Sequence, residues 1–162
     1  MSRLISKLVK VLLFAAVSVI VVVLVGMRTK CEPVMSVMRR VNRACWNPRA
    51  MKTAGTSGAY ASVIRHVGRT SGQVYETPVT AEPTDDGFVI ATPYGPGADW
   101  VKNVLASGTA TIVDEGVVHD VDRPEIVSMH SVESWFPDQD RRAHRLFGVD
   151  QCLRVRLAAG AD

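Results

Sequence analysis

The chain has 162 residues, of which 47% are hydrophobic and 22% are charged, a composition typical of a folded domain with at most a short appendage. The charge is uneven. Residues 1–52 carry ten Lys or Arg and one acid, a net charge of +9, whereas residues 53–162 carry nine Lys or Arg and fifteen acids, a net charge of −6. A basic front on an acidic body argues against a nucleic-acid binder, whose folded domain would itself be basic, and favours a front segment beside an anionic surface such as a membrane.

The three cysteines, Cys31, Cys45 and Cys152, are scattered along the chain and form no CxxC pair. This pattern predicts reduced thiols in a cytosolic setting rather than a disulfide framework or a zinc site. The sequence has no HExxH motif and no cluster of Cys and His, so we predict no bound metal.

Residues 11–27, VLLFAAVSVIVVVLVGM, contain no charged side chain. A helix rises about 1.5 Å per residue, so this run reaches the short limit for crossing a bilayer core. Arg3, Lys7 and Lys10 before it would also suit a signal peptide, but no A-x-A-like cleavage site follows. We therefore predict a retained single-pass anchor within residues 1–30, with a cleaved signal as the alternative. More basic residues follow the run than precede it, which predicts a cell-membrane protein with a cytoplasmic domain.

Residues 34–46, VMSVMRRVNRACW, place apolar side chains three and four apart, which predicts a short amphipathic helix. Pro48 is expected to end this helix. Two arrangements are open: the helix packs on the domain with its basic side chains in solvent, or it lies among lipid headgroups. It belongs to a linker region predicted over residues 31–59.

From residue 60 the pattern changes to short β-type runs separated by turn residues. Strands are predicted over residues 60–67, 74–81, 88–92, 109–113, 117–121 and 151–157. Helices are predicted over residues 100–106, with Asp99 as N-cap and Gly108 as the stop, and over residues 125–133 and 138–147. Hairpin connections without βαβ spacing predict a mainly β fold with helices, a six-stranded antiparallel split β-barrel over residues 60–162.

Two loops carry the candidate chemistry. Residues 68–72, Gly-Arg-Thr-Ser-Gly, offer a guanidinium and two hydroxyls to a phosphate, although most loops of this composition are plain hairpin turns. Residues 91–103, ATPYGPGADWVKN, form a Gly- and Pro-rich loop that runs into a helix N-terminus, an end that attracts negative charge. Trp100 and Asn103 lie on one face of that helix. Either they form the wall of a pocket for a flat ring, or Trp100 belongs to the core and Asn103 makes a cap-like hydrogen bond.

The order of three motifs along the chain resembles that of the deazaflavin-dependent nitroreductase family. The motifs are GRTSG, Thr77-Pro78-Val79, and the loop that leads into W-x-x-N-V-L. The members of this actinobacterial family are split β-barrel oxidoreductases that use coenzyme F420. The resemblance covers roughly residues 33–157, and the WVKNVLASG stretch after YGP is similar to one branch, here with a membrane anchor. It implies hydride transfer from the reduced deazaflavin to a quinone, a nitro compound or an enone, with the cofactor supplying the chemistry.

The same resemblance implies which residues bind the cofactor. Arg69, Thr70 and Ser71, with Gly72 in the same loop, would contact its phosphate and acidic tail. Tyr75, Thr77, Pro78 and Val79 would line its chain and ring edge, Ala91, Thr92 and Pro93 would offer backbone groups to the ring, and Asp99, Trp100 and Asn103 would close the pocket.

Outside these motifs the sequence assigns less. Trp135 and Phe136 either line an apolar substrate pocket or belong to the core, and no proton donor is assigned. His66 and His119 are expected to be structural residues of strands. His144 lies in a basic run and is expected on a solvated helix face.

The chain departs from the family pattern where Thr70, Tyr75 and Pro93 stand at positions that often carry Lys or Arg. Each charged hydrogen bond that is absent removes about 1.5–3 kcal/mol from the binding of a polyanion, which Arg65 and Lys102 could offset. The leading hypothesis is a membrane-anchored F420-dependent reductase that acts on a quinone-like acceptor and binds no nucleic acid. Two alternatives are an FMN enzyme on the same barrel and a non-enzymatic module that binds a lipid, a haem or a quinone.

Overall fold

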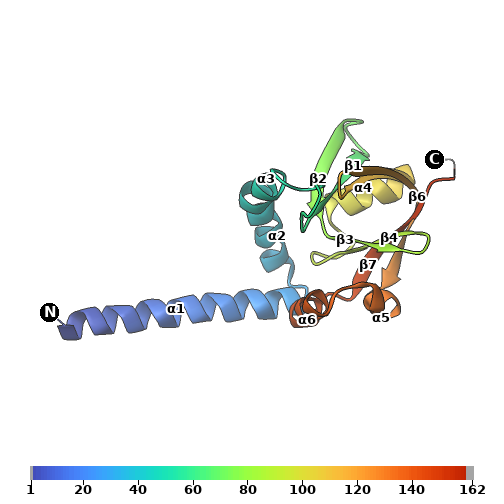
Figure 1. Ribbon diagram of the computed structural model, residues 1–162. Helices are drawn as coiled ribbons and strands as arrows, with labels where there is room; N and C mark the ends of the chain where they lie inside the picture. The colour runs from blue at the N-terminus through green and yellow to red at the C-terminus, as the bar shows by residue number, and fades with distance from the viewer. Residues whose placement is uncertain (1, 160–162) are drawn as a thin grey trace.

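The computed structural model describes residues 2–159. Its body is an antiparallel sheet in the order β2-β1-β5-β6-β7-β4-β3 that curls into a half-open barrel (Figure 1). The strands are β1 Ser62–Val67, β2 Val74–Val79, β3 Ala81–Thr84, β4 Gly87–Ala91, β5 Thr109–Asp114, β6 Val117–Ser128 and β7 Gln151–Leu157. The split-barrel prediction, with a helix before it, is confirmed, although the sheet has seven strands rather than six.

The extra strand arises where the chain turns from one sheet edge to the other. The run predicted over residues 74–81 divides at Thr80 into β2, which pairs with β1, and β3, which pairs with β4. These two strands are the opposite edges of the sheet, yet only one residue separates them. The edge strands β2 and β3 must therefore lie close together at Thr80, and the sheet curls to bring its two edges together.

The helix predicted over residues 125–133 is wrong in its first four residues. Residues 125–128 continue β6 and pair with β7, after a register shift between Asp122 and Glu125 where Arg123 adopts a φ of 50°. Only the short helices α5, Met129–Val132, and η2, Glu133–Trp135, remain of it. Pairing with a strand distant in sequence overrides the local helical pattern here.

Helix α4, Asp99–Ser107, packs against β1 and β5, and its buried Val101 and Val104 join the barrel core. Its N-cap is Ala98, so the prediction of Asp99 as N-cap is wrong; the Asp99 side chain bonds to two arginines instead of to the helix backbone. Gly108 ends the helix in the left-handed conformation at a φ of 74°, as predicted. Helix α6, Asp138–Phe147, lies where it was predicted.

Before the barrel, α1, Ser2–Arg28, projects from the body, and α2, Glu32–Val41, runs on through η1, Asn42–Trp46, into α3, Asn47–Ala50 (Figure 1). The prediction that Pro48 ends this helix is wrong. The wide π-helical turn η1 precedes the proline and absorbs it, because Pro48 then falls in the first turn of α3, where its missing N–H is not needed. We call residues 32–50 the crossing segment, since it runs across the direction of α1 (Figure 1).

Residues Ile5–Arg28 of α1 are long and apolar enough to cross a membrane, by length and composition. The side chains along most of this helix are exposed, including Leu13 and Phe14. Only its last turn is enclosed, where Gly26 and Met27 are buried against the body.

Candidate functional site

A groove of about 1150 Å³ lies between the crossing segment and the barrel. On the barrel side it is lined by β1, β2 and the loop between them, by the loop before α4, and by the first turns of α4. The opposite wall is formed by residues of the crossing segment. Figure 1 shows this segment beside the barrel. Both loops that the sequence singled out therefore open onto the same groove.

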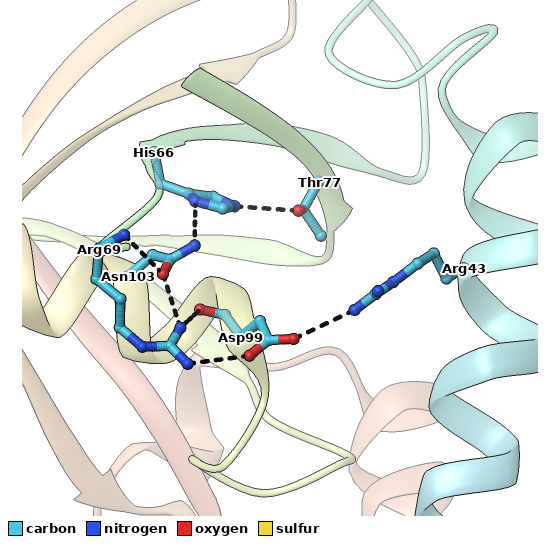
Figure 2. Close-up of polar contacts among 6 residues, drawn as sticks. All are labelled: Arg43, His66, Arg69, Thr77, Asp99 and Asn103. Atoms are coloured by element: carbon cyan, nitrogen blue, oxygen red, sulfur yellow. Dashed lines mark hydrogen bonds and ion pairs between the residues drawn. The ribbon is translucent and has the colours of Figure 1, made fainter. Parts of the chain in front are cut away.

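A chain of hydrogen bonds ties these loops together (Figure 2). The backbone N–H and the guanidinium of Arg69 donate to Asn103 Oδ1 over 3.2 and 2.8 Å. Asn103 Nδ2 lies 3.2 Å from His66 Nδ1, and His66 Nε2 lies 3.2 Å from Thr77 Oγ1. The loop after β1, helix α4 and strand β2 thus meet through four side chains.

The donor and the acceptor of each hydrogen bond in this series follow from the chemistry of the groups. Asn103 Oδ1 accepts from Arg69, so its amide nitrogen must donate to His66 Nδ1. His66 is then neutral with its proton on Nε2, which donates to Thr77. Burial lowers the pKa of His66 and favours the same neutral form. The hydroxyl proton of Thr77 is left to donate to a ligand in the groove that this residue lines.

Asp99 lies between two arginines at the start of α4. Its Oδ1 is 3.3 Å from Arg69 Nη2 and its Oδ2 is 3.3 Å from Arg43 Nη2, which comes from the crossing segment (Figure 2). The bond from Arg69, followed by that from Arg43, holds the pKa of this carboxyl below its usual range. Asp99 is therefore ionised at neutral pH and neutralises part of the charge of both arginines.

The loop of residues 68–72 is held in a single shape. Gly72 N–H donates to Gly68 O over 2.8 Å, and Gly68 N–H donates to Gln73 O over 2.7 Å. A Cβ on Gly68 would lie 2.4 Å from Ser71 Oγ and 2.6 Å from Tyr75 Cε2, so a larger residue there would displace these two side chains. Ser71 Oγ also lies 3.1 Å from the hydroxyl of Tyr75, whose ring stacks on His66 with centroids 5.9 Å apart.

Most of the residues that the resemblance implied reach this groove. The lining includes Arg69, Thr70, Ser71, Tyr75, Thr77, Pro78, Val79, Ala91, Pro93, Asp99, Trp100 and Asn103. Gly72 and Thr92 do not line it. The hydroxyl of Thr92 is buried and donates to Gln151 O over 2.7 Å, so this side chain holds the end of β4 to β7.

The structure places neither Trp135 nor Phe136 on the groove. Phe136 is buried in a small core with Met129 and Val149, which is the core role that the sequence left open for it. Trp135 is 39% exposed.

Comparisons with known proteins give only distant likenesses. No family model matches the chain, and no curated protein is significantly similar to it. A solved F420-H2 dependent reductase (FDR-A) aligns with a TM-score of 0.42 at 14% identity, over 58% of this chain and 92% of that one. A protein of the pyridoxinephosphate oxidase family from Clostridium acetobutylicum, related to general stress protein 26 of B. subtilis, aligns with a TM-score of 0.45 at 11% identity, over 68% and 80%. Likenesses this low carry no argument about activity.

Several lining residues were not singled out from the sequence. Arg39, Arg40, Arg43 and Trp46 reach the groove from the crossing segment. The basic residues of its predicted amphipathic helix were the available signal, but the sequence does not show which face turns toward the barrel.

Tyr60 and His144 also line the groove. The Tyr60 hydroxyl donates to Asp140 Oδ1 over 2.9 Å. His144 was expected on a solvated face, but it is half-buried and packs edge-on against Phe136, with ring centroids 4.9 Å apart. Burial lowers the pKa of His144, with a smaller opposing effect from Asp140.

The charge of the groove is positive. Five cationic residues line it, namely Arg39, Arg40, Arg43, Arg69 and Lys102, against the two acids Glu76 and Asp99. Arg65, which the sequence offered as a compensating cation, pairs with Glu76 at 2.7 Å and does not line the groove. The crossing segment therefore supplies three cations to a site that has none at Thr70, Tyr75 and Pro93. This donor set fits a polyanionic cofactor.

Proposed function

We propose that the chain is a membrane-anchored oxidoreductase that binds coenzyme F420 in the groove and passes a hydride from its reduced form to a lipophilic acceptor such as a quinone. One observation carries the proposal. The two loops of the F420-family motif, separated by 18 residues in the sequence, line one groove and are joined by the bonds of Arg69 to Asn103 and Asp99. The anion-binding loop and the flat-ring wall of that family would thus lie together.

The side chains of the groove have distinct tasks in this proposal. Arg69 would meet the phosphate, because Asn103 and Asp99 hold its guanidinium at the mouth of the loop. Thr77 would donate its free hydroxyl proton to the ring or chain of the cofactor. Trp100, packed on the barrel core from its other side, would give a rigid wall for a flat ring.

The basic wall of the crossing segment would hold the acidic tail. Arg39 pairs with Glu32 at 2.8 Å and Arg43 with Asp99, while Arg40 has no acidic partner within the described residues. When bound, the deazaflavin supplies two-electron hydride chemistry that no side chain here provides. The protein binds and orients it and excludes water from its ring.

The anchor gives the choice of acceptor a physical reason. A helix in the bilayer holds the groove at the surface where a lipid-soluble acceptor is concentrated, which raises the effective concentration of that acceptor. The excess of basic residues after α1 favours a domain on the cytoplasmic side.

Binding can be tested with the full chain in lipid nanodiscs. We expect oxidised F420 to bind saturably, followed by its fluorescence, and Arg69→Gln to weaken binding by about tenfold or more, the value of one charged hydrogen bond. Arg142→Gln is the matched control, because Arg142 is an exposed arginine that does not line the groove. Reduced F420 should then be oxidised when a menaquinone-like acceptor is added.

Other outcomes would replace the proposal. Binding of FMN without F420 would select a flavin enzyme. Binding of neither, with lipid or haem retained on purification, would select a non-enzymatic module. An Arg69→Gln affinity equal to that of Arg142→Gln would place the cofactor outside this groove.

A further inference from the structure

The crossing segment buries Met35 against the protein, with Val34 and Met38 half-buried, and leaves a second apolar stripe exposed. Ser36, Arg39, Arg40 and Arg43 line the groove. Val37, Val41 and Ala44, three and four positions apart, do not line it and are exposed, the two valines by 57% and 39%. A helix that only packs on a domain needs one apolar face, which Met35 supplies here, so the exposed stripe is a second face without a partner among the described residues.

The joint between α1 and the body is held by hydrogen bonds and by a close approach of two helices. Arg28 Nη1 donates to Arg145 O and Lys30 Nζ to Gly148 O, each over 2.7 Å, so two cations complete the C-terminal end of α6. A Cβ on Gly26 would lie 2.5 Å from Val34, which shows how closely α1 and α2 approach. The direction of α1 therefore sets the direction of the crossing segment and of the groove.

These directions place the crossing segment where a bilayer surface would lie. In Figure 1 it runs across the axis of α1, on the side of the barrel toward which α1 projects. If α1 crosses a bilayer, the segment lies along the membrane plane, between the lipid and the groove. The exposed apolar side chains of α1 and those of the stripe would then both contact the same bilayer.

We propose that the crossing segment lies in the headgroup region of the bilayer that holds α1, with Val37, Val41 and Ala44 toward the acyl chains. Exposed Arg49 near its end, and exposed Lys52 just beyond it, contact lipid phosphates, and Trp46, 61% exposed, lies at the level that indole rings prefer. The occupant of the stripe is lipid. This inference rests on the proposed insertion of α1 and not on the identity of the cofactor.

The arrangement has a consequence for the site. The same helix whose apolar stripe contacts lipid forms the basic wall of the groove, so the groove opens beside the membrane surface. A lipophilic acceptor would enter from the bilayer, past Trp46, without crossing bulk water. Loosening the segment from lipid would also displace the cations that line the groove.

A depth measurement tests the inference without any cofactor. Cys45 lies in the segment and is exposed, whereas Cys152 is buried, so the Cys31→Ser variant can be labelled at Cys45 with the fluorophore NBD. The full chain is reconstituted in nanodiscs of phosphatidylcholine and phosphatidylglycerol. We expect blue-shifted emission and quenching by lipids brominated on their acyl chains. Labels at other positions are placed in the Cys31→Ser/Cys45→Ser background, and one at Val117→Cys, in the β5–β6 hairpin, is the water-exposed control.

A second label and a charge substitution separate the possible failures. A label at Val17→Cys in α1 reports the anchor itself; quenching there with water-like emission at Cys45 would overturn this inference alone, and no quenching at either site would overturn the anchoring as well. Val41→Asp should shift the Cys45 emission to the red, whereas Val117→Asp, at an equally exposed valine, should not. Cross-linking between the Cys45 residues of two copies, without quenching, would assign the stripe to a dimer and overturn the proposal.

Discussion

The Arg43 guanidinium and the Asp99 carboxylate, 56 positions apart in the chain, lie 3.3 Å from each other across the groove. The pair joins the crossing segment to the first turn of α4. Because the same carboxylate also pairs with Arg69, an anionic ligand must compete with Asp99 for both arginines.

This competition predicts effects of opposite sign. Asp99→Asn should strengthen F420 binding several-fold, since it removes a negative charge and frees two guanidinium groups. Arg43→Gln should weaken it by about tenfold, one charged hydrogen bond. Both affinities are measured by fluorescence titration at low ionic strength, with Arg142→Gln as the control.

Stability should change little in either variant. The side chains of Arg43 and Asp99 are 76% and 61% exposed, and exposed ion pairs contribute about 0–1 kcal/mol to the free energy of unfolding. Weaker F420 binding by Asp99→Asn would contradict the competition and show that the carboxylate acts mainly by positioning Arg69 or by contacting the cofactor itself.

The neutral state of His66 predicts a pH dependence of stability. Its pKa in the folded state lies below the ordinary 6.5, so the unfolded chain binds a proton more readily. Its contribution is therefore fully present above pH 6.5 and is lost as the pH falls from there through the lowered pKa. We expect the urea midpoint of unfolding to decrease between pH 7.5 and pH 5, and this decrease to be smaller in His66→Gln.

His144 shares this direction, so His66→Gln should remove only part of the pH dependence and the double variant with His144→Gln more of it. His130→Gln is the matched control, because His130 is exposed. Equal slopes in His66→Gln and His130→Gln would show that folding does not lower the pKa of His66.

The strands and the site loops could be predicted because their signals are local. The alternating runs and the GRTSG turn need only a few neighbouring residues, and most of them appear in the structure where predicted. Residues 125–128 were predicted wrongly because their pairing with β7 is distant in sequence. The basic wall that the crossing segment forms in the groove could not be predicted from the sequence, for a related reason. Its amphipathic pattern was visible, but the face that turns toward the barrel depends on packing and pairing with segments distant in sequence, such as the Arg43–Asp99 pair.

Tyr60 is predicted to stabilise the start of α6. Its hydroxyl is the one side-chain donor to the Asp140 carboxylate among the described residues, and Asp140 is only 7% exposed, with Oδ2 left without a partner. Tyr60→Phe should therefore cost about 1–3 kcal/mol of unfolding free energy, the penalty for leaving a buried polar group unpaired. Urea unfolding measures this cost, with Tyr94→Phe as the control.

A double-variant cycle shows whether Tyr60→Phe destabilises the protein by removing the hydrogen bond to Asp140 or by changing the packing of the aromatic ring. In an Asp140→Leu background, Tyr60→Phe should cost little, since no carboxylate then needs the donor. An unchanged cost in that background would show that the hydroxyl acts on a different group.

The cysteines predict a two-class pattern of thiol reactivity. Cys31 and Cys45 are exposed, whereas Cys152 is fully buried in the core beside Met129, and burial raises the pKa of its thiol from 9.0 to about 12. At pH 8 its thiolate fraction is then about a thousandfold below that of an ordinary cysteine, and its sulfur is also inaccessible. With an excess of a chromogenic disulfide reagent, two thiols should react in a fast phase and the third at the rate of unfolding. Addition of urea should merge the two phases, and the slow phase should be missing in Cys152→Ala. Three fast thiols in the native protein would mean that β7 opens readily, and labelling at Cys45 would then require the Cys152→Ala background.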